Sequence, residues 1–195
     1  MEHPQQHTGR PDPIDHVAHV APVDPVDPVA QIQAEWRRER PDLDVSPQAV
    51  IGRLHRLADR LSAELALVYQ RYGLGEGEFD VLAALRRAGA PYERAPGELA
   101  AHTMVTTGAM TKRIDRLERA GLVTRRPAED DRRGRVVALT DAGRRLIDEA
   151  FTAHMRNEHR LLAHLAPEEA AALQTLLTAW QTRLDGTGEP ERRAG

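Results

Sequence analysis

Apolar residues recur every three or four positions along most of this chain, which is the spacing of helices that bury one face. The longest such stretch predicts a helix from Ser46 to about Tyr72. Ser46 is the expected N-cap, Pro47 the first helical residue, and Gly73 the end of the helix. Its apolar face comprises Val50, Leu54, Leu57, Leu61, Leu65 and Val68.

The same spacing predicts several shorter helices and one further long helix. A helix carrying Val29, Ile32 and Trp36 is expected to end before Pro41. The other expected helices cover residues 77–88, 96–100, 107–120, 140–164 and 167–184. Two strand-like runs, 122–126 and 135–139, flank a polar segment, which predicts a β-hairpin. The expected fold class is therefore mainly α with a small β-hairpin.

The two ends of the chain have the composition of disordered segments. Residues 1–28 contain six prolines and are expected to form a disordered Pro-rich arm, and 186–195 a disordered tail. Four histidines of the arm have irregular spacings that do not indicate a metal site. The start of the chain has no secretory pattern, and no apolar run approaches the length of a membrane span, so we expect a cytoplasmic protein. The absence of cysteine excludes disulfides and thiolate metal sites.

Charge is unevenly distributed along the chain. The formal net charge of −3 argues by itself against a nucleic-acid partner. Residues 104–136, however, contain nine Lys or Arg and five acidic residues, a net charge of +4 in that window. A basic segment on an acidic protein favours contact with a polyanion. A solvated helix face is the alternative reading.

The expected helices 96–100 and 107–120 are joined by a short turn, which is typical of a helix-turn-helix. On the second helix Met110, Ile114 and Leu117 share one face and are expected to be buried. The residues of the opposite face are small near the start of the helix and basic further on. Small residues allow close approach to bases, and basic residues can anchor on phosphates. The residues expected to contact DNA from this helix and its start are Thr106, Thr107, Gly108, Thr111, Lys112 and Arg116. An ordinary amphipathic surface helix would have the same distribution of apolar and polar residues around its axis.

The tip of the expected hairpin favours the DNA-binding interpretation. Arg132, Arg133 and Arg135 lie on one narrow loop, and arginine suits the negative potential of the minor groove. Asp131 is expected to orient a neighbouring arginine. The hairpin would then be a DNA-binding wing.

Three segments together resemble the signature of the MarR family of transcriptional regulators: 108–118, 121–123, and 131–133 with 138–140, followed by Gly143. The resemblance covers about 47–184. It implies a winged helix-turn-helix at 76–139 and an obligate-type homodimer with interlocked dimerisation helices at 46–75 and 140–185. It also implies a palindromic operator and repression relieved by a ligand. Apolar residues outside the winged core are expected to be buried by the partner: Leu146, Ile147, Phe151, Leu161, Leu162, Leu165, Leu173, Leu176, Leu177 and Trp180.

Residues 29–45, an extra N-terminal helix with a linker, carry a second resemblance, to the urate-responsive HucR and PecS branch of the family. Position by position it implies a ligand site of Trp36, Asp80, Arg113 and Arg125. Urate is planar and monoanionic near neutral pH, so an indole can stack on it and a guanidinium can pair with its anionic edge. Trp36 as a packing anchor, a citrate-like or phenolic acid ligand at the same arginines, and a DNA-binding protein without a ligand are the alternatives.

An enzymatic function finds little support in the sequence. It contains no Gly-rich phosphate loop, no Ser-His-Asp spacing and no metal cluster. The spacing of His154, His159 and His164 scatters them around a helix, so no cofactor and no metal are expected. A dimerisation scaffold would explain the long helices but not the arginine-tipped hairpin. A DNA compactor without operator preference stays open.

Overall fold

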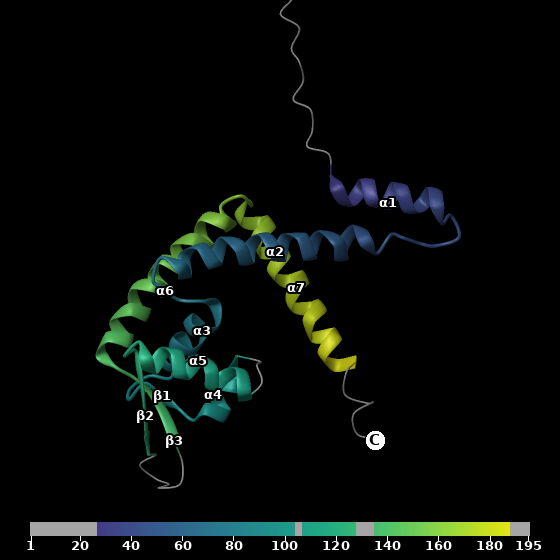
Figure 1. The fold of residues 1–195 in the computed structure, drawn as a ribbon. Helices are drawn as coiled ribbons and strands as arrows, with labels where there is room; N and C mark the ends of the chain where they lie inside the picture. Colours follow the sequence, from purple (N-terminus) through teal and green to yellow (C-terminus); the bar gives the residue numbers. More distant parts are fainter. Residues whose placement is uncertain (1–26, 104–106, 128–134, 188–195) are drawn as a thin grey trace, which may run out of the picture. The chain divides into compact units, whose positions relative to one another are not determined.

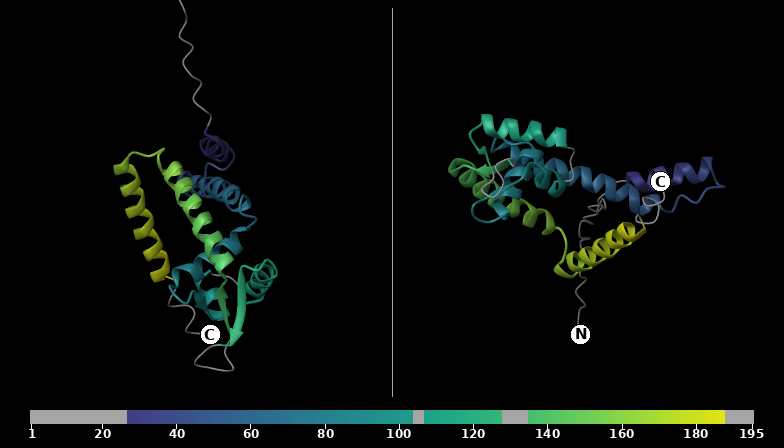
Figure 2. Two further views of the ribbon diagram at one scale, coloured as in Figure 1. Left: turned by 90° about the vertical axis from the view of Figure 1, so that its left-hand side faces the viewer. Right: turned by 90° about the horizontal axis from the view of Figure 1, so that it is seen from below.

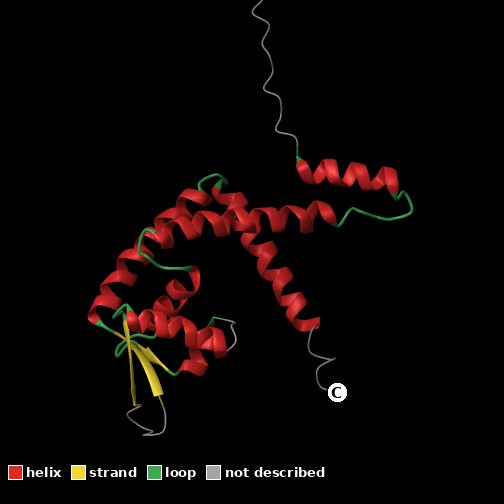
Figure 3. Cartoon of the chain, viewed as in Figure 1, coloured by secondary structure: helices red, strands yellow, loops and turns green. Residues whose placement is uncertain are grey.

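The computed structural model describes residues 27–103, 107–127 and 135–187. Figure 3 shows that helices dominate and that the strands lie together at one end of the winged part. The chain divides into two compact units, residues 1–55 and 56–195. The helix α2 (Gln48–Gln70) begins in the first unit and continues in the second. In the described part of the chain no helix is long and apolar enough to cross a membrane.

The described part of the first unit contains α1 (Pro28–Glu39) and the start of α2. Asp27 caps α1 by accepting a hydrogen bond of 2.9 Å from the backbone N–H of Val29, and it also forms an ion pair with Arg53 of α2. Val29 is buried, and a Cβ atom at Gly52 would lie 3.2 Å from its Cγ1. Gln33, also buried, donates 2.9 Å to the Val45 carbonyl. These contacts hold α1 against the start of α2.

The start of α2 differs from the expectation at Ser46. The Ser46 hydroxyl donates 2.9 Å to Asp44 instead of capping the helix, and its backbone N–H donates to the same carboxylate at 2.9 Å. The Ser46 carbonyl accepts from the backbone N–H of Ala49 at 3.0 Å. The Ser46 hydroxyl is bound to Asp44 rather than to the backbone of α2. The predicted N-cap was therefore wrong.

The core of the second unit lies among α3 (Glu76–Arg87), α4 (Pro96–His102), α5 (Thr107–Arg119) and a small sheet. The predicted apolar faces are confirmed, since Phe79, Leu82 and Leu85 of α3 are buried. The largest fully buried side chains of the unit are Val81, Leu82, Leu85, Leu99, Met110, Ile114, Leu117, Val137 and Ile147. Gly121 ends the turn after α5 with a φ of 71°, a conformation that favours glycine.

The sheet has three antiparallel strands in the order β1-β3-β2. The expected hairpin is present as β2 (Val123–Pro127) and β3 (Arg135–Leu139), which pair from Val123 opposite Leu139 to Pro127 opposite Arg135. The expectation missed β1 (Glu93–Arg94), which pairs with β3 through Glu93 opposite Ala138. Two residues are too few for any periodicity, so this strand depends on the partner that it meets.

The helix α6 (Asp141–Leu162) leaves the sheet directly after β3. Its predicted cap is confirmed, because Thr140 Oγ1 accepts 3.0 Å from the backbone N–H of Gly143. The Leu122 carbonyl accepts from the Thr140 N–H at 3.1 Å, while the Thr140 hydroxyl donates to the Gly121 carbonyl at 2.8 Å. A Cβ atom at Gly143 would lie only 2.0 Å from the Leu122 carbonyl oxygen. The start of α6 is therefore packed directly on the backbone before β2.

The last helix, α7 (Pro167–Thr187), turns back after α6, so that the two run in opposite directions (Figure 2). It carries exposed apolar side chains, among them Leu176, 68% exposed, and Leu184, 60% exposed. The set of residues expected to need a partner was partly wrong. Ile147 is fully buried in the core of its own chain, and Leu146 packs against that core.

Candidate functional site

The helix α5 presents two contrasting faces. Met110, Ile114 and Leu117 are at most 2% exposed, which confirms the predicted wheel. The opposite face is exposed, and it carries Gly108, Thr111, Lys112 and Arg116. A Cβ atom at Gly108 would meet no atom within 4 Å, so this part of the helix is open to close approach. This face can accept a large polar surface without disturbing the core.

The remaining residues expected to bind DNA lie around this helix and at the hairpin. Thr107 is the first residue of α5, and Arg135 is the exposed first residue of β3. Thr106, Arg132 and Arg133 lie outside the described residues. The structure thus describes the helix and the base of the hairpin. The other residues of the expected DNA-binding surface are predicted from the sequence alone.

Arg116 is tied to the start of α3. Its Nε lies 2.5 Å from Oε1 of Glu78, whose side chain is 14% exposed. The second carboxylate oxygen of Glu78 accepts 2.6 Å from the backbone N–H of Gly75 and so caps α3. Glu78 therefore stabilises the α3 terminus and compensates the charge of Arg116 at once. Sequence reasoning missed this pair, because the two residues are 38 positions apart.

Arg113, one turn before Arg116, packs against the same end of α3. A Cβ atom at Gly77 would lie 2.3 Å from Cζ of Arg113, so the guanidinium occupies the space left by this glycine. Its Nη1 is buried and has no hydrogen-bond partner among the residues that the structure describes. A buried donor without a partner is costly. Arg113 is therefore a cation directed inward from α5 with capacity to bind an acceptor.

Asp80 lies one turn after Gly77 on α3 and is half-buried. Burial raises the pKa of Asp80, and the negative charge of Glu76 raises it further. The positive charge of Arg113 acts in the opposite direction, as do Arg87 and His154. Arg113 and Asp80 are therefore electrostatic neighbours, although the described contacts include no ion pair between them.

Arg125 has other partners. Its guanidinium pairs with Asp115 and Glu118 of α5, and its backbone N–H donates 3.2 Å to Glu118. These bonds join the start of the hairpin to the second half of α5. Of the four residues expected to bind ligand, the second unit thus brings Asp80 and Arg113 together and gives Arg125 to a separate ion-pair cluster.

Trp36, the fourth of these residues, lies on α1 in the first unit. Its side chain is 46% exposed, so the structure of that unit does not use it as a fully buried packing anchor. Its carbonyl accepts 2.8 Å from the backbone N–H of Arg40, which ends the helix.

An aromatic cluster beside Asp80 was not foreseen. The Tyr69 hydroxyl lies 3.3 Å from Nδ1 of His154, whose Nε2 lies 3.1 Å from Glu158. The ring of Tyr69 also stacks on Phe79, with 4.2 Å between centroids. Burial raises the pKa of Tyr69 to about 12, helped by the negative charges of Asp80, Glu76 and Glu158. Periodicity placed Phe79 in the core, but no local signal joined His154 to a residue 85 positions away.

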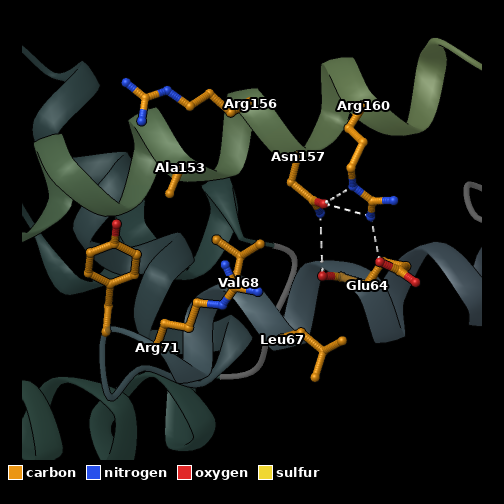
Figure 4. A pocket seen from close by; sticks show the side chains of 9 residues that line it. Glu64, Leu67, Val68, Arg71, Ala153, Arg156, Asn157 and Arg160 are labelled. Carbon is orange, nitrogen blue, oxygen red and sulfur yellow. Dashed lines mark hydrogen bonds and ion pairs between the residues drawn. The ribbon is translucent and has the colours of Figure 1, made fainter.

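A separate pocket of about 640 Å³ lies between α2 and α6 (Figure 4). It is lined by Glu64, Leu67, Val68, Arg71, Tyr72, Ala153, Arg156, Asn157 and Arg160. None of these residues was expected to bind ligand or DNA. Among the described residues, no group of three His, Asp or Glu side chains could hold a metal ion.

Comparison with known proteins places this arrangement among transcriptional regulators. The sequence model of the MarR family matches residues 72–134. The chain is 43% identical to the HTH-type transcriptional regulator PecS of Dickeya dadantii over 148 residues, 76% of this chain and 89% of PecS. It is 30% identical to the multiple antibiotic resistance protein MarR of Escherichia coli over 129 residues, 65% of this chain and 88% of MarR.

Solved structures give the same result for the fold. AbsC, a MarR family transcriptional regulator from Streptomyces coelicolor, matches with a TM-score of 0.64 and 27% identity, over 74% of this chain and 98% of AbsC. A mutant of E. coli MarR complexed with operator DNA matches with a TM-score of 0.61 and 28% identity, over 70% of this chain and 98% of that protein.

Proposed function

Because the chain belongs to the MarR family of DNA-binding transcriptional regulators, which are not enzymes, we propose that it is a ligand-responsive repressor. It binds a palindromic operator as a homodimer, and a small planar anion such as urate releases it. The likeness to PecS over 89% of that regulator supports a function of the same type.

The exposed face of α5 is the proposed DNA reader. Gly108 allows close approach to base edges, while Lys112 and Arg116 supply cations for phosphates. Thr106 and Thr107 add hydrogen-bond donors at the start of the helix, where free N–H groups attract anions. Arg132, Arg133 and Arg135 of the wing enter the minor groove. The match to a MarR protein complexed with operator DNA supports this assignment.

The homodimer is proposed from the apolar surface of the last two helices. Phe151 and Leu162 of α6 and Leu176, Leu177 and Leu184 of α7 are 42–68% exposed. Apolar patches of this kind are typical of interfaces between copies of a chain. A second copy that covers them would interlock the terminal helices and place two recognition helices on one duplex.

One observation carries the proposed switch, namely the buried, unpartnered Nη1 of Arg113 beside Asp80. A monoanion can accept a charge-assisted hydrogen bond from this guanidinium. Asp80 carries the same sign as the ligand and is repelled by it. Since Arg113 belongs to the recognition helix, its movement toward a ligand displaces the DNA-reading face, and binding of ligand and operator oppose each other.

The test is a mobility-shift titration on the operator, which footprinting of the chain's own upstream region would locate. Urate is expected to raise the apparent Kd for that operator. Arg113→Gln should still bind the operator but lose the urate response, whereas Arg119→Gln, an exposed control on the same helix, should keep it. No effect of millimolar urate on operator affinity would refute the urate proposal.

Parallel titrations with citrate and salicylate decide between the ligand classes that the same arginines could bind. Release by one of these acids and not by urate would replace the ligand but keep the switch. Urate quenching of Trp fluorescence, compared between the wild type and Trp36→Phe, tests the part of the hypothesis that rests on α1. Trp180 serves as the internal reference.

A further inference from the structure

We propose that the pocket between α2 and α6 is a second binding site, for a small dianion that carries carboxylate or phosphate groups. Its lining residues are different from Asp80, Arg113 and Arg125, so this inference is independent of the proposed switch. It rests on the size of the pocket, its apolar floor and its uncompensated positive charge.

The size and floor of the pocket suit a small molecule. Its volume of about 640 Å³ lies within the range of about 300–1,000 Å³ that ligand sites occupy. Leu67, Val68 and Ala153 contribute apolar side chains, and Val68 is buried. Tyr72 and Asn157 add groups that can donate hydrogen bonds. Most of the other lining residues are polar or charged, which suits a charged ligand.

At one end of the pocket, the charged side chains pair with each other. The Arg160 guanidinium donates 2.6 Å to Glu64 and 3.1 Å to the side-chain oxygen of Asn157. The Asn157 amide in turn donates 3.4 Å to the Glu64 carbonyl. Figure 4 shows this network spanning from α6 to α2. It links α2 to α6 at this end of the pocket.

The rest of the pocket has positive charge without compensation. Arg71, directly after α2, and Arg156 on α6 both line the pocket, and Arg71 ends beside Val68 (Figure 4). Neither guanidinium has a hydrogen-bond or ion-pair partner within the described ranges of the chain. With Arg160 and Glu64 included, the lining carries three positive charges and one negative charge, a net charge of +2. A dianion neutralises this excess, and two guanidinium groups on facing helices can each pair with one anionic group.

The experiment is isothermal titration calorimetry of the full chain with succinate and, separately, with inorganic phosphate, in buffer matched for ionic strength with chloride. We expect saturable binding of one dianion per protomer. Arg71→Gln/Arg156→Gln should weaken it by about tenfold or more, because charge-assisted bonds are lost. Arg145→Gln/Arg183→Gln removes two exposed arginines outside the pocket, and this control should bind as the wild type does.

Several results would overturn the proposal. Equal loss of binding in both double variants would reduce it to general charge attraction, and no saturable binding of either probe would remove it. A changed dimer equilibrium of Arg71→Gln/Arg156→Gln without dianion binding would assign the pocket to the second copy. Preference for succinate or for phosphate identifies which group the site recognises. If the double variant does not fold, the two single variants are titrated, and each should bind more weakly than the wild type.

Discussion

Replacing Gly143 by alanine tests how tightly α6 is joined to the winged part. The added Cβ would lie 2.0 Å from the Leu122 carbonyl oxygen and 2.9 Å from its carbon, and both are backbone atoms. Side-chain carbons do not approach other atoms closer than 3.0 Å, so the backbone must separate by about 1 Å. A flexible side chain could move away easily, but the backbone at Leu122 and at the start of α6 cannot.

The expected loss of stability follows from three contributions. Forcing a methyl group into a packed site costs about 1–3 kcal/mol. The Leu122 carbonyl would also lose good geometry to the N–H of Thr140, at about 1 kcal/mol. Alanine returns about 1 kcal/mol through its higher helix propensity. The free energy of unfolding of Gly143→Ala should therefore fall by about 1–3 kcal/mol.

Thermal unfolding at one fixed protein concentration measures this change, because the stability of the proposed dimer would depend on concentration. The melting temperature should fall by about 2–12 °C. Gly97→Ala is the matched control, since a Cβ at Gly97 in α4 meets no atom within 4 Å. It should leave the melting temperature unchanged or raise it slightly. Equal melting temperatures of Gly143→Ala and the wild type would refute the close contact between α6 and Leu122.

Three further substitutions give separate tests. Gly77→Ala should push the Arg113 guanidinium away by at least about 0.7 Å, so operator affinity should fall by about 5- to 150-fold in a mobility shift while stability changes little; unchanged affinity and urate response would contradict the role of Arg113. Asp80→Asn should stabilise the protein at neutral pH, because a raised pKa means that the ionised carboxyl destabilises the fold above its ordinary pKa of 3.8. That gain should shrink as the pH falls through the folded-state pKa, and denaturant titrations at pH 7 and near pH 4 would reveal a gain that fails to shrink. Thr140→Ala should lower the free energy of unfolding by about 0.5–2 kcal/mol in urea, through loss of the α6 cap; a midpoint equal to that of the wild type would argue against this cap.

Local rules predicted the elements of the DNA-reading part well. The wheel of α5 assigned Met110, Ile114 and Leu117 to the core, and all three are buried. Thr140 as a cap and Gly121 as a terminator each depend on a few neighbouring residues, and both are confirmed. Such features are visible in a sequence because the residues that decide them are adjacent.

Features that depend on distant partners were not predictable in this way. Glu78 carries both an N-terminal cap and the ion pair to Arg116, but only the fold brings the two residues together. Gly77 gives no sequence signal that its missing side chain makes room for Arg113. Ser46 shows the opposite case, since a standard capping residue found a nearer partner in Asp44. The predicted ligand site of Trp36, Asp80, Arg113 and Arg125 depends on such distant contacts and stays a prediction.

The ion pair between Arg116 and Glu78 also bears on how strongly DNA binding by this protein depends on salt concentration. Each cation that binds a phosphate releases a counterion from the duplex, and the number released sets the steepness of the salt dependence. Arg116 is paired with the carboxylate of Glu78, so in the proposed complex a phosphate must displace Glu78 before it binds Arg116. Glu78 would keep its bond to the Gly75 N–H and leave a negative charge beside the DNA. In the proposed complex, an operator that holds α5 in register can compensate this exchange better than random DNA, so we expect the pair to disfavour binding to random sequence.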